Sequence, residues 1–260
     1  MPTTWQEYAT IWHMKYELET IPVWDGVKSD CECFLCELMK QAEEHSVNFY
    51  LGSSVMNPET RMRVNEHGFC PEHFEKLVEA GKPQALALMC DTYLARSREK
   101  LAGSFRAIAQ AKPGRKLDAA VQGFSDGLRA RESGCLICTQ MKGRLDRYCF
   151  TTAYLWKQDM EFRQALAASK GVCLHHLEAL LKMSGEALEA SARAEFCKAL
   201  VELTERNLDR IAADVLWMTQ KYKSENMDKP WNGCEDAQKR AVFKMIGRGR
   251  VRDALDKMPK

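Results

Sequence analysis

The chain has 260 residues, of which 45% are hydrophobic and 28% are charged, and its formal net charge is +2. This composition is typical of a soluble globular protein, and so small a charge gives no overall field that would favour nucleic acid or an anionic membrane. No window approaches the roughly 20 apolar residues of a membrane helix, and no secretory signal is recognised at the N-terminus. We therefore expect a cytoplasmic protein without a membrane partner.

Helix signals follow one another from the N-terminus. A capping box formed by Thr4 and Glu7 opens the first predicted helix, and a second is expected over residues 33–51. Asn57 followed by Pro58 then gives a cap and a proline at the first position of a third helix, which should end at Gly68.

Proline and glycine also delimit the helices that follow. Pro71 opens a short helix ended by Gly81, and Pro83 opens a long one that reaches about residue 111. The stretch "AKPGRK", residues 111–116, has the composition of a linker. Since no segment combines alternating polarity with β-branched enrichment, no strands are expected and the fold class is all-α.

After this linker the sequence repeats itself. "SGCLIC" (133–138) matches "CECFLC" (31–36), and "KGVCLHHL" (170–177) matches "HGFCPEHF" (67–74). "FCKALVELTERNL" (196–208) also resembles "MCDTYLARSREKL" (89–101). We therefore predict a duplicated helical bundle with two pseudo-symmetric halves around long helices 83–111 and 186–222. The halves are residues 1–111 and 117–222, and residues 223–260 form a basic C-terminal extension.

Each copy supplies three thiols and one imidazole as a CxxC and a GxCxxH motif. Because residues three apart share one helix face, each pair can converge on one ion, and a helix start favours the thiolate form of a cysteine. Three cysteines and one histidine are a structural zinc set. The predicted first site is Cys33, Cys36, Cys70 and His73, and the second is Cys135, Cys138, Cys173 and His176.

Other readings of these residues stay open. The cysteines and histidines could be buried packing groups, although a matched duplicate makes this the weaker interpretation. Three cysteines and a histidine can also hold a [4Fe–4S] cluster. Cys31 has no counterpart in the second copy and is either an exposed loop thiol, a spare ligand or a redox partner. Cys90 and Cys197 match each other on the long helices, where buried packing is the default.

The remaining patterns point to no enzyme class. Six basic residues and no acid lie between Lys239 and Arg252, and this run is the only hint of nucleic-acid binding. The sequence contains no phosphate-cradling glycine loop, no HExxH and no GxSxG, and no catalytic residues are assigned.

The paired motifs, together with "IPVWDGVKSDCECFLCEL" and "DKPWNGCEDAQKRAVFKMIG", give the chain a family resemblance. It resembles an uncharacterised bacterial domain-of-unknown-function family of helical proteins with CxxC and GxCxxH halves, common in anaerobic Gram-positive bacteria. The resemblance covers almost the whole chain and implies an all-α, metal-binding protein without an established activity.

The leading hypothesis is a structural or interaction protein stapled by two zinc ions, with an unidentified protein partner. The alternative is a redox protein, which either carries iron–sulfur clusters or uses zinc thiolates as an oxidant switch beside Cys31.

Overall fold

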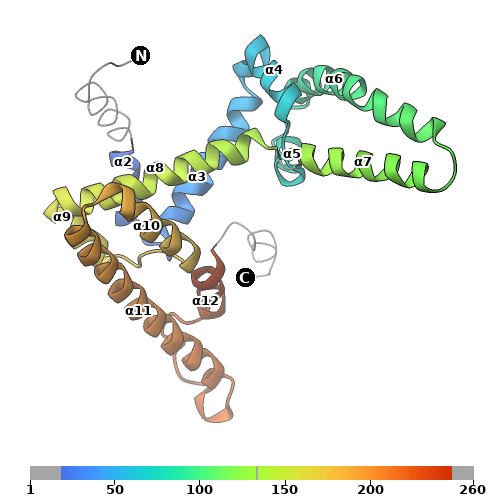
Figure 1. The fold of residues 1–260 in the computed structure, drawn as a ribbon. Helices are drawn as coiled ribbons and strands as arrows, with labels where there is room; N and C mark the ends of the chain where they lie inside the picture. Colours follow the sequence, from blue (N-terminus) through green and yellow to red (C-terminus); the bar gives the residue numbers. More distant parts are fainter. Residues whose placement is uncertain (1–18, 133, 248–260) are drawn as a thin grey trace, which may run out of the picture. The chain divides into compact units, whose positions relative to one another are not determined.

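The computed structural model describes residues 19–132 and 134–247, so the helix predicted from Thr4 and Glu7 lies outside the described residues. The described residues form helices and no strands, which confirms the all-α prediction (Figure 1). The helices in chain order are α2 (Thr20–Lys28), α3 (Phe34–Tyr50), η1 (Ser53–Met56), α4 (Pro58–His67), α5 (Pro71–Glu79), α6 (Pro83–Gln110), α7 (Arg115–Glu132), α8 (Leu136–Gln158), α9 (Met160–Ala168), α10 (Leu174–Ala187), α11 (Ala190–Lys221), η2 (Ser224–Asn226) and α12 (Ala237–Ile246). No helix in this part of the chain is long and apolar enough to cross a membrane.

The chain divides into two compact units. Unit 2 comprises residues 42–142, and unit 1 comprises the described residues of 1–41 and 143–260. These boundaries fall at other positions than the predicted halves 1–111 and 117–222. The difference arises because two long helices cross the boundaries: α3 begins in unit 1 and ends in unit 2, whereas α8 begins in unit 2 and ends in unit 1.

Helix starts and ends follow local chemistry where the sequence indicated it. The Asn57 side chain accepts hydrogen bonds from the backbone N–H groups of Glu59 and Thr60 at 2.8 and 3.4 Å, and Pro58 is the first residue of α4. Helix α4 ends at Gly68, whose φ of 64° is one that side-chain-bearing residues rarely adopt. The long helix predicted from Pro83 to about residue 111 is α6, which ends at Gln110.

Each unit has its own hydrophobic core. In unit 1 the largest fully buried side chains include Phe34, Phe162 and Phe196, and Phe162 packs edge-on against Trp24 with ring centroids 5.1 Å apart. In unit 2 the core is built around Tyr50 and Phe69, whose rings pack edge-on at 4.9 Å. The thiols of both CxxC motifs are attached to these cores, because Cys33 and Cys135 are each buried in one of the two clusters.

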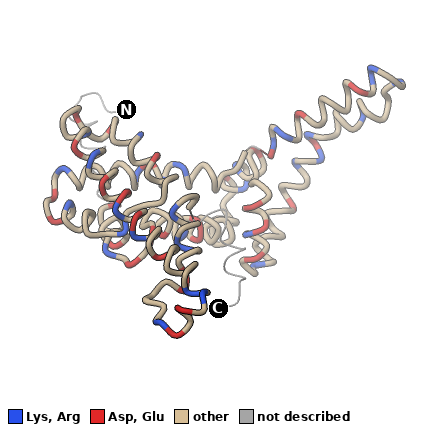
Figure 2. The backbone as a smooth tube through the Cα atoms, turned by 90° about the horizontal axis from the view of Figure 1, so that it is seen from below, with Lys and Arg blue, Asp and Glu red and all other residues tan. Residues whose placement is uncertain are grey.

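Charges are spread over the helices rather than gathered in one region. Figure 2 shows Lys and Arg interspersed with Asp and Glu along the described chain. For example, the carboxylate oxygens of Glu66 in α4 form ion pairs with the side-chain nitrogens of Arg96 and Lys100 in α6, at 3.3 and 2.9 Å. These pairs are about half exposed and therefore orient the helices more than they stabilise them.

The glycine of the first GxCxxH motif should be intolerant of a side chain. A Cβ at Gly68 would lie 2.6 Å from the Tyr93 hydroxyl, whereas a Cβ at Gly81, which has a similar φ of 67°, would meet nothing within 4 Å. Both alanine variants carry backbone strain, but only G68A adds an overpacked contact. We expect urea denaturation to show G68A less stable than G81A by about 1–3 kcal/mol. Equal losses would mean that the close approach to Tyr93 is unimportant.

Candidate metal centres

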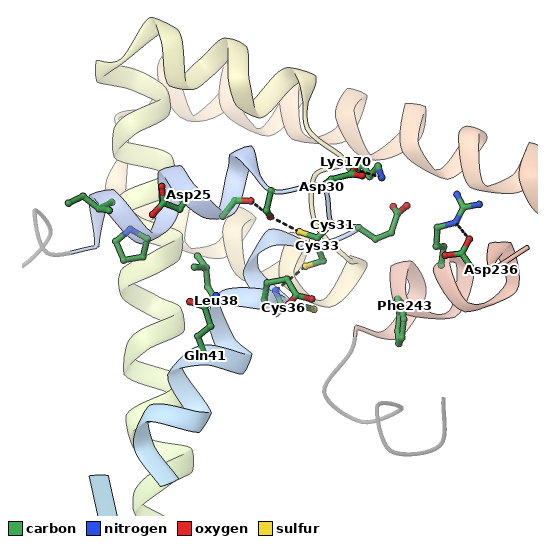
Figure 3. Close-up of a pocket in the computed structure, with 17 residues that line it drawn as sticks. Asp25, Asp30, Cys31, Cys33, Cys36, Leu38, Gln41, Lys170, Asp236 and Phe243 are labelled. Atoms are coloured by element: carbon green, nitrogen blue, oxygen red, sulfur yellow. Dashed lines mark hydrogen bonds and ion pairs between the residues drawn. The ribbon is translucent and has the colours of Figure 1, made fainter. Parts of the chain in front are cut away.

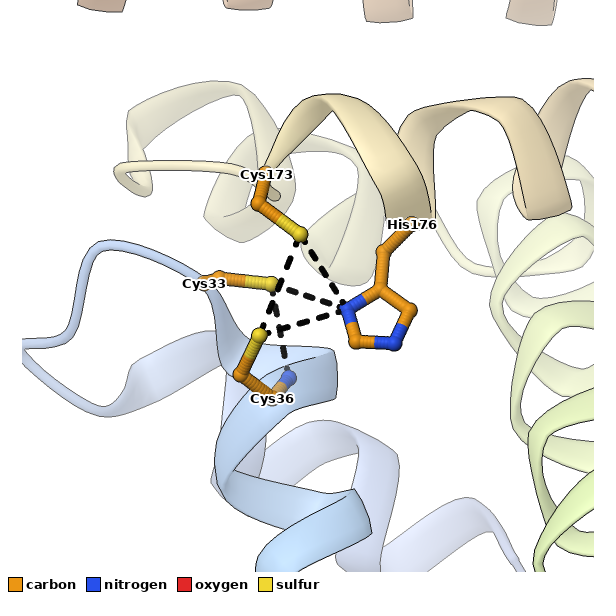
Figure 4. A group of neighbouring side chains, drawn as sticks. All are labelled: Cys33, Cys36, Cys173 and His176. Carbon is orange, nitrogen blue, oxygen red and sulfur yellow. Dashed lines mark hydrogen bonds between the residues drawn. The ribbon is translucent and has the colours of Figure 1, made fainter. Parts of the chain in front are cut away.

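Four ligand-type side chains meet in unit 1. Cys33, Cys36, Cys173 and His176 each direct one ligand atom to a common point, and these atoms all lie within 4.8 Å of one another (Figure 4). The Nδ1 atom of His176 is 3.3 Å from the sulfur of Cys33 and 3.4 Å from that of Cys36. The sulfurs of Cys36 and Cys173 are 3.8 Å apart. We call this set the unit 1 group.

Unit 2 holds a matching set, the unit 2 group, composed of Cys70, His73, Cys135 and Cys138. Here the Nδ1 atom of His73 is 3.1 Å from the sulfur of Cys70 and 3.3 Å from those of Cys135 and Cys138. The sulfurs of Cys70 and Cys138 are 3.8 Å apart, as in the unit 1 group. Both groups could hold a metal ion, and together they contain all eight residues singled out from the sequence.

The predicted pairing of the motifs is wrong. We expected Cys33 and Cys36 to join Cys70 and His73, but the structure joins them to Cys173 and His176. The second CxxC motif correspondingly joins the first GxCxxH motif. Each group thus combines motifs from both sequence copies, because α3 and α8 carry the chain out of the unit in which each helix begins.

Backbone contacts between the motifs accompany this exchange. The N–H of Phe34, which follows Cys33, donates to the carbonyl of Gly171 at 3.4 Å. The N–H of Leu136, which follows Cys135, donates to the carbonyl of Gly68 at 3.2 Å. Both glycines have positive φ, 70° and 64°, so the glycine of each GxCxxH motif presents its carbonyl to the CxxC motif of the other copy.

Every ligand lies at the start of a helix. Cys70 and Cys173 are the N-cap residues of α5 and α10, with nearly the same backbone angles. Cys33 immediately precedes α3, and its sulfur accepts the N–H of Cys36 at 3.4 Å. The free N–H groups and the positive end of the helix dipole stabilise a thiolate at these positions. Four helix starts therefore supply the ligands of the two groups.

The histidine of the unit 2 group has a carboxylate partner that the sequence analysis did not identify. The Nε2 atom of His73 is 3.1 Å from an oxygen of Glu43, and the other oxygen of Glu43 accepts from Lys76 at 2.5 Å. Burial raises the pKa of Glu43, but hydrogen bonds from His73 and Lys76 outweigh it and hold the pKa at about 2. A carboxylate on Nε2 leaves Nδ1 facing the thiols, an arrangement typical of metal-binding histidines.

The thiols and imidazoles also perturb one another. In the unit 2 group burial opposes ionisation, but the hydrogen bond from His73 outweighs it and lowers the pKa of Cys135 to about 6. Burial lowers the pKa of His73, yet hydrogen bonds to Cys135 and Glu43 raise it to about 10. In the unit 1 group hydrogen bonds from Cys33 and Cys36 lower the pKa of Cys173 well below its ordinary value. In the unit 2 group these shifts favour a thiolate at Cys135 next to an imidazolium at His73.

The other cysteines stand apart from the two groups. Cys31 belongs to neither group among the described residues and lies 3.1 Å from the hydroxyl of Ser29. It lines an open cleft of about 850 Å³ in unit 1, which also reaches Cys33 and Cys36 (Figure 3). Cys90 and Cys197 are half-buried, and the sulfur of Cys197 lies 3.7 Å from the Ser184 hydroxyl. The structure places none of these three among the candidate ligands.

Comparisons with known proteins give a family without an assigned activity. The model of DUF6062, a family of unknown function, matches residues 14–252. The chain is 24% identical over 187 residues to the "Uncharacterized 23.9 kDa protein in xynA 3'region" of Caldicellulosiruptor sp. (strain Rt8B.4). The aligned residues cover 72% of this chain and 80% of that protein. No solved structure matches the chain significantly.

The exchanged pairing can be tested through thiol proximity. We expect a short thiol-to-thiol cross-linker, present under native conditions while a chelator removes any bound metal, to join Cys36 to Cys173 and Cys70 to Cys138, because each pair of sulfurs is 3.8 Å apart. Mass spectrometry of the digested protein would identify the joined peptides. Cross-links between Cys36 and Cys70 as the main product would contradict the exchange and restore the pairing within each copy.

Proposed function

The chain belongs to the DUF6062 family, whose function is unknown, and we propose that it is a helical scaffold protein stapled by two zinc ions, one in each unit. The observation that carries this proposal is the convergence of three sulfurs and one imidazole nitrogen in each of two groups, whose six cysteines are all free of disulfides. Such sets at helix starts are the donors that zinc takes in structural sites.

The distances between ligand atoms support a single tetrahedral ion. With zinc–sulfur bonds of about 2.3 Å, two sulfurs on a tetrahedral ion lie about 3.8 Å apart. Each group has one such sulfur pair recorded at 3.8 Å, and its sulfur-to-nitrogen distances of 3.1–3.4 Å are within a few tenths of an ångström of the tetrahedral value. An ion in the centre would therefore need little movement of the surrounding helices.

The same spacing bears on the iron–sulfur alternative. A four-iron cluster binds each ligand through a different iron, which holds the ligand atoms farther apart than a single ion does. Ligand atoms that all lie within 4.8 Å of one another favour the single ion. The oxidant-switch alternative gains less support, because Cys31, on which it depends, lies outside the ligand group.

The ligand sets favour a structural over a catalytic role. Three cysteines and one histidine fill all four positions of a tetrahedral ion, so no position is left for a substrate or an activated water. Each ion would instead connect segments that are distant in sequence, residues 33–36 with 173–176 and residues 70–73 with 135–138. Because structural zinc contributes its binding free energy to folding, about 10–16 kcal/mol in small zinc domains, the two ions would dominate the stability of the scaffold.

The proposal predicts two zinc ions per chain. Elemental analysis of protein purified without air should give two zinc equivalents, no iron and no visible chromophore. Cobalt substitution should produce the intense visible bands of tetrahedral thiolate coordination, and C36S should retain one ion because only the unit 1 group loses a ligand.

Two results would count against this function. Protein without stoichiometric metal, whose thermal unfolding is unaffected by a strong chelator, would show that the thiols are packing groups. Stoichiometric iron and sulfide would replace zinc by a cluster and reinstate the redox alternative.

Glu43 provides a test of the unit 2 group alone. We expect Glu43→Gln to weaken zinc binding by about 10–100-fold at that group, since loss of the carboxylate removes the partner that orients His73. Competition with a chromophoric chelator would measure the affinity. The neighbouring exposed variant E44Q serves as the matched control and should bind both ions as the parent protein does. Equal affinities for E43Q and E44Q would remove Glu43 from the site.

A further inference from the structure

The two groups differ sharply in how far they are covered. In the unit 1 group Cys173 is 0% exposed, Cys33 6% and His176 7%. In the unit 2 group Cys135 and His73 are similarly buried, but Cys70 is half-buried and Cys138 is exposed. One cysteine of the unit 2 group is therefore exposed to solvent, whereas all three cysteines of the unit 1 group are buried.

The cover of the unit 1 group includes the C-terminal extension, which has no counterpart in the first sequence copy. Gly247, directly after α12, approaches the ligands so closely that a Cβ there would lie 3.3 Å from the sulfur of Cys173 and 3.8 Å from that of Cys36. Any larger residue would press on the sulfurs. The end of α12 thus closes one side of the group.

A buried lysine holds this cover in place. Lys244 of α12 is 1% exposed, and its ammonium group donates to the carbonyl of Glu32 at 2.7 Å and to that of Lys170 at 2.5 Å. Glu32 immediately precedes Cys33, and Lys170 lies just before the glycine of the second GxCxxH motif. The one side chain therefore ties α12 to both segments that carry the ligands.

Further contacts anchor the same helix. Glu32 accepts from Arg210 of α11 at 2.6 Å and lies 3.6 Å from Lys244. Arg240 of α12 pairs with Asp214 of α11 at 2.7 Å. The cleft in unit 1 reaches Cys33 and Cys36 and is lined in part by Arg240 and Phe243 of α12, but both cysteines remain at most 9% exposed. Because so little of either cysteine faces the cleft, a ligand that replaces one of them requires α12 or a core segment to move.

We propose that the two centres exchange metal differently: the unit 2 centre gives up its ion to small chelators through Cys138, while α12 locks the unit 1 centre. This inference rests on the proposed function, since it requires an ion in each group. At the unit 2 centre Cys70, His73 and Cys135 would hold the ion while an incoming thiolate or nitrogen donor supplied the electron pair that replaces that of Cys138. Cys138 would keep its own pair and remain on the chain as a thiolate, so no oxidant or reductant would be needed.

The exposure of Cys138 indicates which kind of molecule can take the ion from the unit 2 centre. The exposed Cys138 admits a small ligand, such as a low-molecular-weight thiol or a chelating amine, before the half-buried Cys70 and the buried His73 and Cys135 are reached. The ligand class of the unit 2 centre is therefore a small chelating molecule with sulfur or nitrogen donors.

The test uses the full-length protein loaded with two zinc ions and an excess of 4-(2-pyridylazo)resorcinol, which absorbs in the visible range when it takes zinc. We expect two phases of one zinc each, separated in rate by about tenfold or more. In parallel, brief treatment with N-ethylmaleimide followed by mass spectrometry should label Cys138 and Cys70 before Cys33, Cys36 and Cys173.

A substitution at Lys244 tests whether α12 slows the release of zinc from the unit 1 centre. Lys244→Met keeps an unbranched side chain, one atom shorter, but removes both hydrogen bonds to the carbonyls. We expect it to speed the slow phase by about tenfold while leaving the fast phase unchanged. Lys223→Met, at an exposed position of the same extension, is the matched control and should change neither phase.

The outcomes separate this inference from the proposed function. If the protein binds no stoichiometric zinc, the proposed function fails. If it binds two zinc ions that leave in one phase, or if Cys33, Cys36 and Cys173 are labelled first, only the exchange proposal is overturned. Should K244M fail to fold, the labelling order in the parent protein still decides which centre is open.

Discussion

Each CxxC helix begins against the glycine-containing loop of the other sequence copy, through a backbone hydrogen bond to the carbonyl of Gly171 in one unit and of Gly68 in the other. This contact sets the rest of the structure. It places four ligands of one group at helix starts, where thiolates are stabilised, and it requires a glycine because the carbonyl is presented from a backbone with positive φ. It also fixes which motifs meet, so α3 and α8 must each leave the unit in which they begin.

Much of the helical organisation could be predicted from the sequence because short-range chemistry determines it. Asn57 and Pro58 define the start of α4, Gly68 its end and Pro83 the start of α6, and the structure confirms all of them. The eight candidate ligands could be singled out because they recur at matched spacing. The pairing could not be read in the same way. Either combination uses the same motifs, and the entropy of closing a loop grows too slowly with its length to favour the nearer partner decisively.

The sequence motifs also could not predict which residues surround the ligands. Glu43 is an ordinary helical glutamate in the sequence. Its role depends on a tertiary contact, because α3 brings it next to His73, which lies 30 residues further along the chain. The second copy has Leu145 at the matching position, where it packs against the core of unit 1. Lys244 belongs to a basic run that suggests a solvated face, yet its ammonium group is buried between two carbonyls. Duplicated motifs predict shared ligands, but not shared surroundings.

Because each CxxC motif pairs with the GxCxxH motif of the other copy, the chain segment closed by the unit 2 group lies entirely within the segment closed by the unit 1 group. The unit 1 group joins residues 33 and 176, and all of unit 2, with its own group between residues 70 and 138, lies within that span. Bringing the ends of the outer span together is easier once the inner span is compact, because a folded insert leaves a shorter effective loop to close. The nesting therefore favours an order of assembly in which unit 2 acquires its structure before the two distant parts of unit 1 meet. Truncation at the linker between α6 and α7 would leave a fragment with one complete motif set but neither of the native ligand groups.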